Sequence, residues 1–170
     1  MKNLLLIFLL LPLISITQNW TNSSNFIGEG RHHPITFSND DYGFVVSGSY
    51  LNNMFKYDKI NDSWSQLQDF PGSGRGYGYA VSYNNKAYVG FGSTDNGSFP
   101  TDWWQYDMLN DIWTQKSSFT GDGRNHPAMI LVNNKIYVGC GSNNNGNLGD
   151  WWEYDLSLIH ISEPTRRRGI

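Results

Sequence analysis

The stretch Phe70-Pro71-Gly72-Ser73-Gly74-Arg75 decides the fold of this chain, because its pattern occurs twice more. The other copies are Phe26 to Arg31, which reads Phe-Ile-Gly-Glu-Gly-Arg, and Phe119 to Arg124, which reads Phe-Thr-Gly-Asp-Gly-Arg. A Trp precedes each Phe by six residues, at Trp20, Trp64 and Trp113. The Arg-to-Arg intervals are 44 and 49 residues. Self-similarity at such a period indicates a repeat architecture, and each unit is long enough for four short strands.

Two apolar segments follow each Arg and predict a hairpin. The dipeptides Asn84-Asn85 and Asn133-Asn134 separate them in the second and third units, and Asn39-Asp40-Asp41 does so in the first. Asn tolerates positive φ, which favours a tight primed turn. The first strands are predicted over 33–37, 77–83 and 126–132, and the second strands over 42–46, 86–90 and 135–139.

Glycines end the second strand of each unit, and a polar loop then leads to an aromatic third strand. Glycine at this point suits a chain that leaves the sheet sharply. Neighbouring aromatic residues on a strand point to opposite faces, so both faces of these strands should be buried. A turn then leads to a fourth strand that carries the repeated Trp, seven residues after a Tyr. The third strands are predicted over 53–58, 102–107 and 150–155.

These features together resemble the Kelch repeat. An Arg precedes the first strand, Tyr-Val-Gly ends the second in two units, Tyr-Asp closes the third, and Asn-Asp-x-Trp opens the fourth. The resemblance covers about residues 20–156, although Gly-x-Gly replaces the family's double Gly after the second strand. It implies an all-β fold, a β-propeller fragment of about three four-stranded antiparallel blades around a central channel. The repeat markers are Trp20, Tyr57, Asp58, Trp64, Tyr106, Asp107, Trp113, Tyr154 and Asp155.

The chain divides into three parts. Residues 1–17, a charged start followed by an apolar run too short to span a bilayer, are predicted to be a signal peptide. An uncleaved anchor and a buried strand are the alternatives. Residues 158–170 break the repeat and resemble translated sequencing-adaptor sequence, so we interpret them as a non-native tail rather than a basic tail for a partner. The partial propeller between them comprises an orphan outer strand at 18–30, blades at 31–74 and 75–123, and an incomplete blade at 124–157.

Charge and cysteine content narrow the functional classes. The formal net charge is −3, and without Lys2 and the tail residues the 12 basic and 15 acidic side chains fall to 8 and 14. Nucleic acid is therefore not an expected partner, because its recognition needs clustered Lys and Arg. The single Cys140 allows no intramolecular disulfide, and we interpret it as a small core residue. We expect a secreted, periplasmic or cell-surface protein with no membrane insertion after signal cleavage.

The candidate ligand-binding residues lie where the first strand of each unit begins. Arg31, Arg75 and Arg124 could clamp a carboxylate, and His33, Tyr77 and His126 follow two residues later. A residue present in every repeat is better explained by the geometry of every repeat than by a single site. We therefore expect the three Arg side chains to bond backbone carbonyls or a nearby acid such as Asp58, Asp107 or Asp155. His32 has no counterpart, because Gly76 and Asn125 take its place.

The sequence contains no recognisable catalytic motif, so we expect neither an enzyme nor a cofactor or metal. The oxygen-rich loops 95–97 and 143–149 lack calcium-loop spacing and are interpreted as flexible turns.

We expect a binding module whose ligand, a protein or a glycan, docks at one mouth of the ring, where Phe99 could stack on a sugar. One alternative is a fragment of a Kelch-type carbohydrate-active enzyme, galactose-oxidase-like or sialic-acid-isomerase-like. Another is an adhesion module with a sorting domain. C-terminal blades of its own chain are the other expected partner.

Overall fold

The structure is a computed structural model, and it describes residues 19–157. The predictions for residues 1–17 and for 158–170 lie outside this range. Within it the regular elements are antiparallel β-strands, which confirms the all-β prediction. No helix in this part of the chain is long and apolar enough to cross a membrane.

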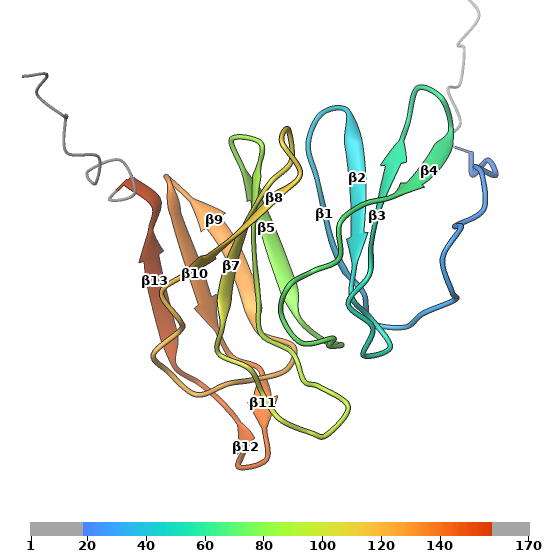
Figure 1. Ribbon diagram of the computed structural model, residues 1–170. Coiled ribbons are helices and arrows are strands. Elements are labelled where there is room, and N and C mark those ends of the chain that lie inside the picture. Colours follow the sequence, from blue (N-terminus) through green and yellow to red (C-terminus); the bar gives the residue numbers. More distant parts are fainter. Residues whose placement is uncertain (1–18, 158–170) are drawn as a thin grey trace, which may run out of the picture.

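Two four-stranded antiparallel sheets and one three-stranded sheet stand side by side (Figure 1). The first sheet contains β1 (Ile35–Ser38), β2 (Tyr42–Val46), β3 (Met54–Asp58) and β4 (Ser63–Gln66), paired in chain order. The second repeats this order with β5 (Tyr79–Tyr83), β6 (Lys86–Gly90), β7 (Trp103–Asp107) and β8 (Ile112–Lys116). The third contains β9 (Ala128–Val132), β10 (Lys135–Gly139) and β13 (Trp151–Asp155). Each sheet is blade-like, because its strands follow one another without a crossover.

The loop 143–149, interpreted as a flexible turn, contributes to a small hairpin of its own. Its strands are β11 (Ser142–Asn143) and β12 (Gly146–Asn147). Gly146 has φ +112°, a conformation open to glycine, and this allows the two strands to pair across a short connection.

The Asn-Asn connections form the tight hairpins that the sequence predicts. Asn84 and Asn85 have φ of 49° and 56°, and Asn133 and Asn134 have φ of 48° and 63°. Two consecutive positive values are those of a type I′ turn. β2, β6 and β10 begin and end at the predicted residues.

The first strand of each unit begins two residues later than predicted. His33, Tyr77 and His126 have φ of 50°, 62° and 49°, so they lie in the left-handed region and cannot belong to a strand. Strand structure starts only at Ile35, at position 79 and at position 128.

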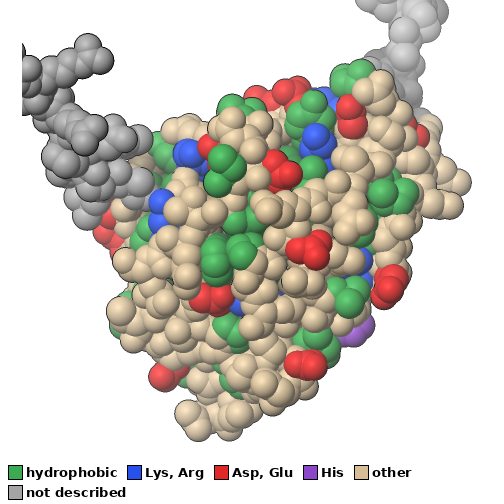
Figure 2. Space-filling view, viewed as in Figure 1, with side chains coloured by type: hydrophobic (Ala, Val, Ile, Leu, Met, Phe, Trp, Pro, Cys, Tyr) green, Lys and Arg blue, Asp and Glu red, His purple; other side chains and the backbone are tan. Residues whose placement is uncertain are grey.

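The core lies between neighbouring sheets, whose innermost strands β1, β5 and β9 are in contact. One cluster joins the first and second sheets through Ile35, Phe44, Val89 and Tyr106. A second joins the second and third sheets through Tyr88, Trp103, Ile136 and Leu156. The aromatic third strands thus fill the space between sheets. On the face shown in Figure 2, acidic, basic and hydrophobic side chains are interspersed.

The orphan strand predicted within residues 18–30 does not form, because the described part of this stretch has no strand pairing. Trp20 is fully exposed. Trp64 in β4 instead lies opposite Tyr57 in β3 and packs on its ring. Trp113 in β8 lies opposite Tyr106 in β7 and packs on its ring in the same way. The difference has a physical cause: no third strand among residues 19–157 lies beside Trp20 to supply an equivalent Tyr.

The prediction that Cys140 is a small core residue is wrong, because Cys140 is exposed. It follows β10 with φ +54°. Its counterparts Ser47 and Phe91 are buried, and Phe91 packs on Phe119 beside the next sheet. Cys140 lies at the end of the stack, where no further sheet covers it in the described chain.

Candidate binding site at the start of the inner strands

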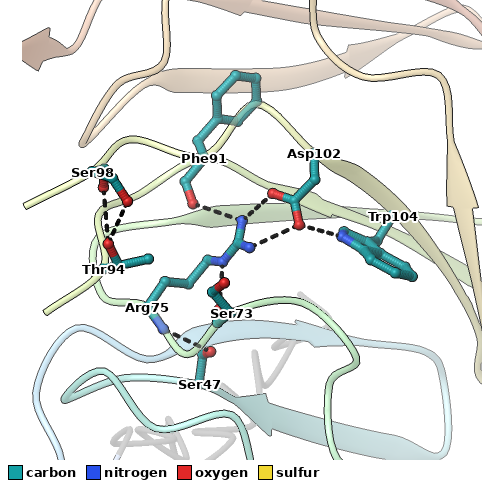
Figure 3. A network of polar contacts seen from close by, with 8 residues as sticks. All are labelled: Ser47, Ser73, Arg75, Phe91, Thr94, Ser98, Asp102 and Trp104. Carbon is teal, nitrogen blue, oxygen red and sulfur yellow. Dashed lines mark hydrogen bonds and ion pairs between the residues drawn. The ribbon is translucent and has the colours of Figure 1, made fainter. Parts of the chain in front are cut away.

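Arg75 is fully buried, and each of its three guanidinium nitrogens donates a hydrogen bond within the protein (Figure 3). Nη1 and Nη2 donate to the two carboxylate oxygens of Asp102 at 2.8 and 2.9 Å. Nη1 also approaches the carbonyl of Phe91 at 3.4 Å, and Nε donates to the carbonyl of Ser73 at 3.0 Å. A bidentate charged pair is among the strongest polar contacts in proteins. Arg75 therefore joins its own loop to both ends of the loop that connects β6 with β7.

Arg124 repeats this arrangement in the third sheet. Its terminal nitrogens donate to Asp150 at 2.5 and 2.8 Å, and to the carbonyl of Cys140 at 3.0 Å. Each guanidinium also lies over the Phe of its own motif, with centroid distances of 4.9 Å to Phe70 and 5.2 Å to Phe119. The side chains are 0 % exposed, so neither Arg can reach a ligand.

Arg31 makes a weaker version of the clamp. Its Nη1 donates to the carbonyl of Ser47 at 2.9 Å and to Oδ1 of Asn53 at 2.7 Å, but its buried Nη2 has no partner among the described residues. Asn53 stands where the other units have Asp, and an amide offers one acceptor oxygen instead of two. Partial burial lowers the pKa of Arg31, and the charge of Glu29 opposes this effect.

All three Arg side chains thus bond carbonyls, as predicted, but only Arg75 and Arg124 bond an acid, and that acid is not the one predicted. Asp58 and Asp107 accept hydrogen bonds from backbone amides of the turns that follow them, and Asp155 accepts one from the amide of Ser157. A carboxylate so engaged stabilises a tight turn. The clamp uses the acid five residues earlier, at the start of the third strand.

The paired carboxylates are held ionised. Hydrogen bonds from Arg124 lower the pKa of Asp150 to about 2, against a smaller opposing effect of burial. For Asp102, burial is the largest effect and raises the pKa, but the bonds from Arg75 and the indole of Trp104 together outweigh it, so the pKa is lowered.

His33, Tyr77 and His126 come together although each precedes the first strand of a different sheet. The ring centroids of His33 and Tyr77 are 4.0 Å apart, those of Tyr77 and His126 are 4.8 Å apart, and those of the two His are 5.8 Å apart. All three lie where the innermost strands begin. The sequence placed these residues at one end of the stack, and the structure assembles them into a single aromatic cluster.

The backbone holds this cluster in place. The amide of Tyr77 donates to the carbonyl of His33 at 3.3 Å, and the amide of His126 donates to the carbonyl of Tyr77 at 3.2 Å. The left-handed φ of the three residues separates each of them from the strand that begins two residues later. Positive φ is unfavourable for bulky residues, and such conformations often occur at functional sites.

His32 and Tyr50 extend the cluster. Nδ1 of His32 lies 2.9 Å from Nδ1 of His33, and the His32 ring lies edge-on to Tyr50 at 6.4 Å. The role of Tyr50 is not apparent from the sequence, because Thr94 and Asn143 take its place in the other units. The one available signal was that His32 departs from the repeat.

A pocket of about 340 Å³ opens beside these rings. It is lined by His33, Pro34, Thr36, Tyr77, Gly78, Tyr79, Ala80 and His126. Its volume lies at the lower end of the range for small-molecule sites. The rings of His126 and Tyr77 make no hydrogen bond to any described residue through their polar atoms, so these groups can engage a ligand. Between residues 19 and 157, no three His, Cys, Asp or Glu side chains are grouped to hold a metal ion.

Comparison with known proteins gives a similarity of fold. No protein-family model matches the sequence, and no curated protein matches it. A solved structure described as "Structure of YjhT" is similar, with a TM-score of 0.59 and 23 % sequence identity over 68 % of this chain. The match spans 35 % of that structure's chain, so this chain corresponds to about a third of its length. At 23 % identity, the similarity shows a shared fold and nothing about function.

Proposed function

We propose that this chain is part of a Kelch-type β-propeller and acts as a secreted binding module. The ligand site is the pocket beside His33, Tyr77 and His126. The convergence of these three side chains from three separate sheets, to within 4.0 to 5.8 Å of one another, carries the proposal. Three aromatic rings with polar edges suit a ligand that has both flat apolar faces and hydroxyl groups, so a glycan fits better than a protein.

The engagement of the Arg side chains supports this choice of site. Arg75 and Arg124 fix the loops that deliver Tyr77 and His126, and their donors are used within the protein. The Arg residues are therefore proposed to position the site, and the residues two positions later are proposed to contact the ligand.

A carbohydrate-active enzyme is the second candidate function, and the paired imidazoles favour it. Nδ1 of His32 and Nδ1 of His33 lie 2.9 Å apart, at a distance over which a proton can be exchanged. Turnover of a bound sugar distinguishes this function from simple binding.

The test is a glycan array probed with the chain and with His33→Asn, Tyr77→Asn and His126→Asn. Asn tolerates positive φ, so each substitution removes a ring while retaining the backbone conformation. We expect binding to fall at least about tenfold, the effect of losing about 1.4 kcal/mol of contact energy. Leu109→Asn, at an exposed turn residue, is the matched control and should bind normally. Unchanged binding in all three variants would contradict the proposed site.

A further inference from the structure

A second pocket lies between the first and second sheets, at the end of the inner strands opposite to the aromatic cluster. The cluster precedes β1 and β5, whereas this pocket lies where those strands end, beside the hairpin turns that lead to β2 and β6. Figure 1 shows these two turns at the opposite end of the stack from β11 and β12. The pocket has a volume of about 330 Å³, and its lining includes Asp40, Ser82, Asn84, Asn85 and Met108.

The small side chain of Ser82 explains why space is left here. Ser82 and Leu131 are repeat counterparts, since each is the fourth residue of the innermost strand of its sheet, β5 or β9. Leu131 packs against the core between the second and third sheets. Ser82 faces the first sheet, because its Oγ accepts a hydrogen bond from the amide of Ser38 at 3.3 Å. A hydroxyl group therefore stands between the first two sheets where a leucine side chain fills the equivalent place between the second and third.

Hydrogen bonds hold the walls of this pocket in place. Nδ2 of Asn39 donates to Oδ1 of Asn85 at 3.2 Å, which links the hairpin turns of the first two sheets. The amide of Met108 donates to the carbonyl of Asn85 at 2.9 Å, which fixes the second turn against the end of β7. The pocket is therefore preformed, and a ligand that enters it does not have to order its walls.

Several polar groups in the lining have unused hydrogen-bonding capacity. The carboxylate of Asp40 and the side-chain amide of Asn84 make no hydrogen bond to any residue between 19 and 157, and Nδ2 of Asn85 makes none either. The hydroxyl of Ser82 accepts one bond and can still donate one. Met108 adds an apolar surface to the lining, and its side chain is buried. Donors and a charged acceptor thus lie beside an apolar contact surface.

This combination favours a neutral ligand with several hydroxyl groups. A hydroxyl group both donates and accepts, so it can donate to Asp40 and accept from the amides of Asn84 and Asn85. The ring of Tyr83, which also lines the pocket, offers a flat face for the C–H groups of a sugar. A calcium ion fits less well, because it takes about six to eight oxygen ligands and Asp40 is the single carboxylate of the lining. The same carboxylate disfavours an anion.

We propose that the pocket between the turns is a second binding site of this chain and takes a neutral monosaccharide unit. Asp40, Asn84 and Asn85 bond the hydroxyl groups of the sugar, and Tyr83 and Met108 contact its carbon atoms. The lining shares no residue with the pocket beside His33, Tyr77 and His126. Either site can therefore be lost without the other, and this proposal does not depend on the proposed function.

Titration of the isotope-labelled full-length chain, followed by NMR of its backbone amides, tests the site. The probes are methyl β-glucoside, methyl β-galactoside and methyl α-mannoside, and calcium chloride is titrated separately. We expect at least one sugar to shift the amide signals of Asn84 and Asn85 saturably, and we expect the same shifts in Tyr77→Asn, which alters only the other pocket. The absence of such shifts with all three sugars would overturn the proposal. Saturable shifts with calcium chloride alone would overturn it too, because the pocket would then be a cation site.

Ser82→Leu is the matched variant, because the third sheet already carries Leu at the equivalent position. We expect the new side chain to fill the pocket and to weaken sugar binding at least about tenfold. Ser65→Leu, which adds the same side chain at an exposed residue of β4, is the control and should bind normally. Asn84→Gly provides a second test that leaves the packing intact, since Gly keeps the positive φ of the turn and removes the amide. It should also weaken binding, and unchanged affinity in either Ser82→Leu or Asn84→Gly would contradict the site.

Discussion

Asp102 accepts hydrogen bonds from both terminal nitrogens of Arg75, whereas Asn53 offers Arg31 a single oxygen in the equivalent place. Within residues 19–157, one unit of the repeat therefore leaves a buried guanidinium nitrogen, Nη2 of Arg31, without a partner. A buried donor without a hydrogen bond destabilises a protein by more than a typical hydrogen bond stabilises it. The Arg clamp of the first sheet is therefore the least stable of the three.

Asn53→Asp should therefore stabilise the chain. The new carboxylate can accept from both nitrogens of Arg31, and we expect the free energy of unfolding to rise by about 1 kcal/mol, a partly exposed charged bond being weaker than a buried one. Urea denaturation measures the change. Asn144→Asp, which adds the same charge at an exposed loop residue, is the control and should have little effect. If the two substitutions raised the free energy of unfolding equally, the increase would come from the change in net charge and not from a bond to Arg31.

Acid should weaken the clamps. The pKa of Asp150 in the folded protein is about 2, below its ordinary value of 3.8, so its pairing with Arg124 stabilises the fold above about pH 4. That contribution is lost as the pH falls from 4 toward 2. Asp102, whose pKa is also lowered, acts in the same direction. Melting temperatures measured across this range should decline less steeply in Asp150→Asn than in the unmodified chain. An equally steep decline in both proteins would show that the Arg124–Asp150 pair does not cause the loss of stability in acid.

Two glycines with similar backbone angles should respond differently to Ala. Gly92 and Gly97 have φ of +91° and +78°. A Cβ on Gly92 would overlap the carbonyl oxygen of Gly76 and lie 2.7 Å from the amide of Gly78, whereas one on Gly97 would meet nothing within 4 Å. We expect Gly97→Ala to cost about 1 kcal/mol from φ alone, and Gly92→Ala to cost several times more. Thermal denaturation measures the two effects, and equal melting temperatures for the two variants would contradict this prediction.

Sequence periodicity predicted the strands because the same physical constraints recur in each unit. Asn-Asn turns, the glycine after the second strand and the Tyr-Asp ending each have a local cause, so β2, β6 and β10 could be predicted to the residue. Trp20 shows the limit of this reasoning. Its spacing matches that of Trp64, but a strand requires a neighbour, and spacing cannot supply one.

The site was predicted less completely than the fold. The sequence indicated that His33, Tyr77 and His126 occupy equivalent positions, but it did not predict their left-handed φ, because bulky side chains rarely adopt it. The partner acids of Arg75 and Arg124 were also misassigned, and Arg31 bonds an amide instead of an acid. Asp107 belongs to the repeated Tyr-Asp pair, but its carboxylate accepts a hydrogen bond from the turn that follows it. Asp102 lies 27 residues after Arg75 in the sequence, and only the fold brings the two side chains together.

The central claim is that the repeated Arg holds the fold and that the residue two positions later contacts the ligand. Paired measurement of melting temperature and glycan-array binding for Arg75→Ala and Tyr77→Asn tests it most directly. We predict that Arg75→Ala loses about 1 to 3 kcal/mol of stability through the unpaired Asp102, and that Tyr77→Asn keeps its melting temperature but loses binding. Unchanged stability with lost binding in Arg75→Ala, or full binding in Tyr77→Asn, would contradict the account.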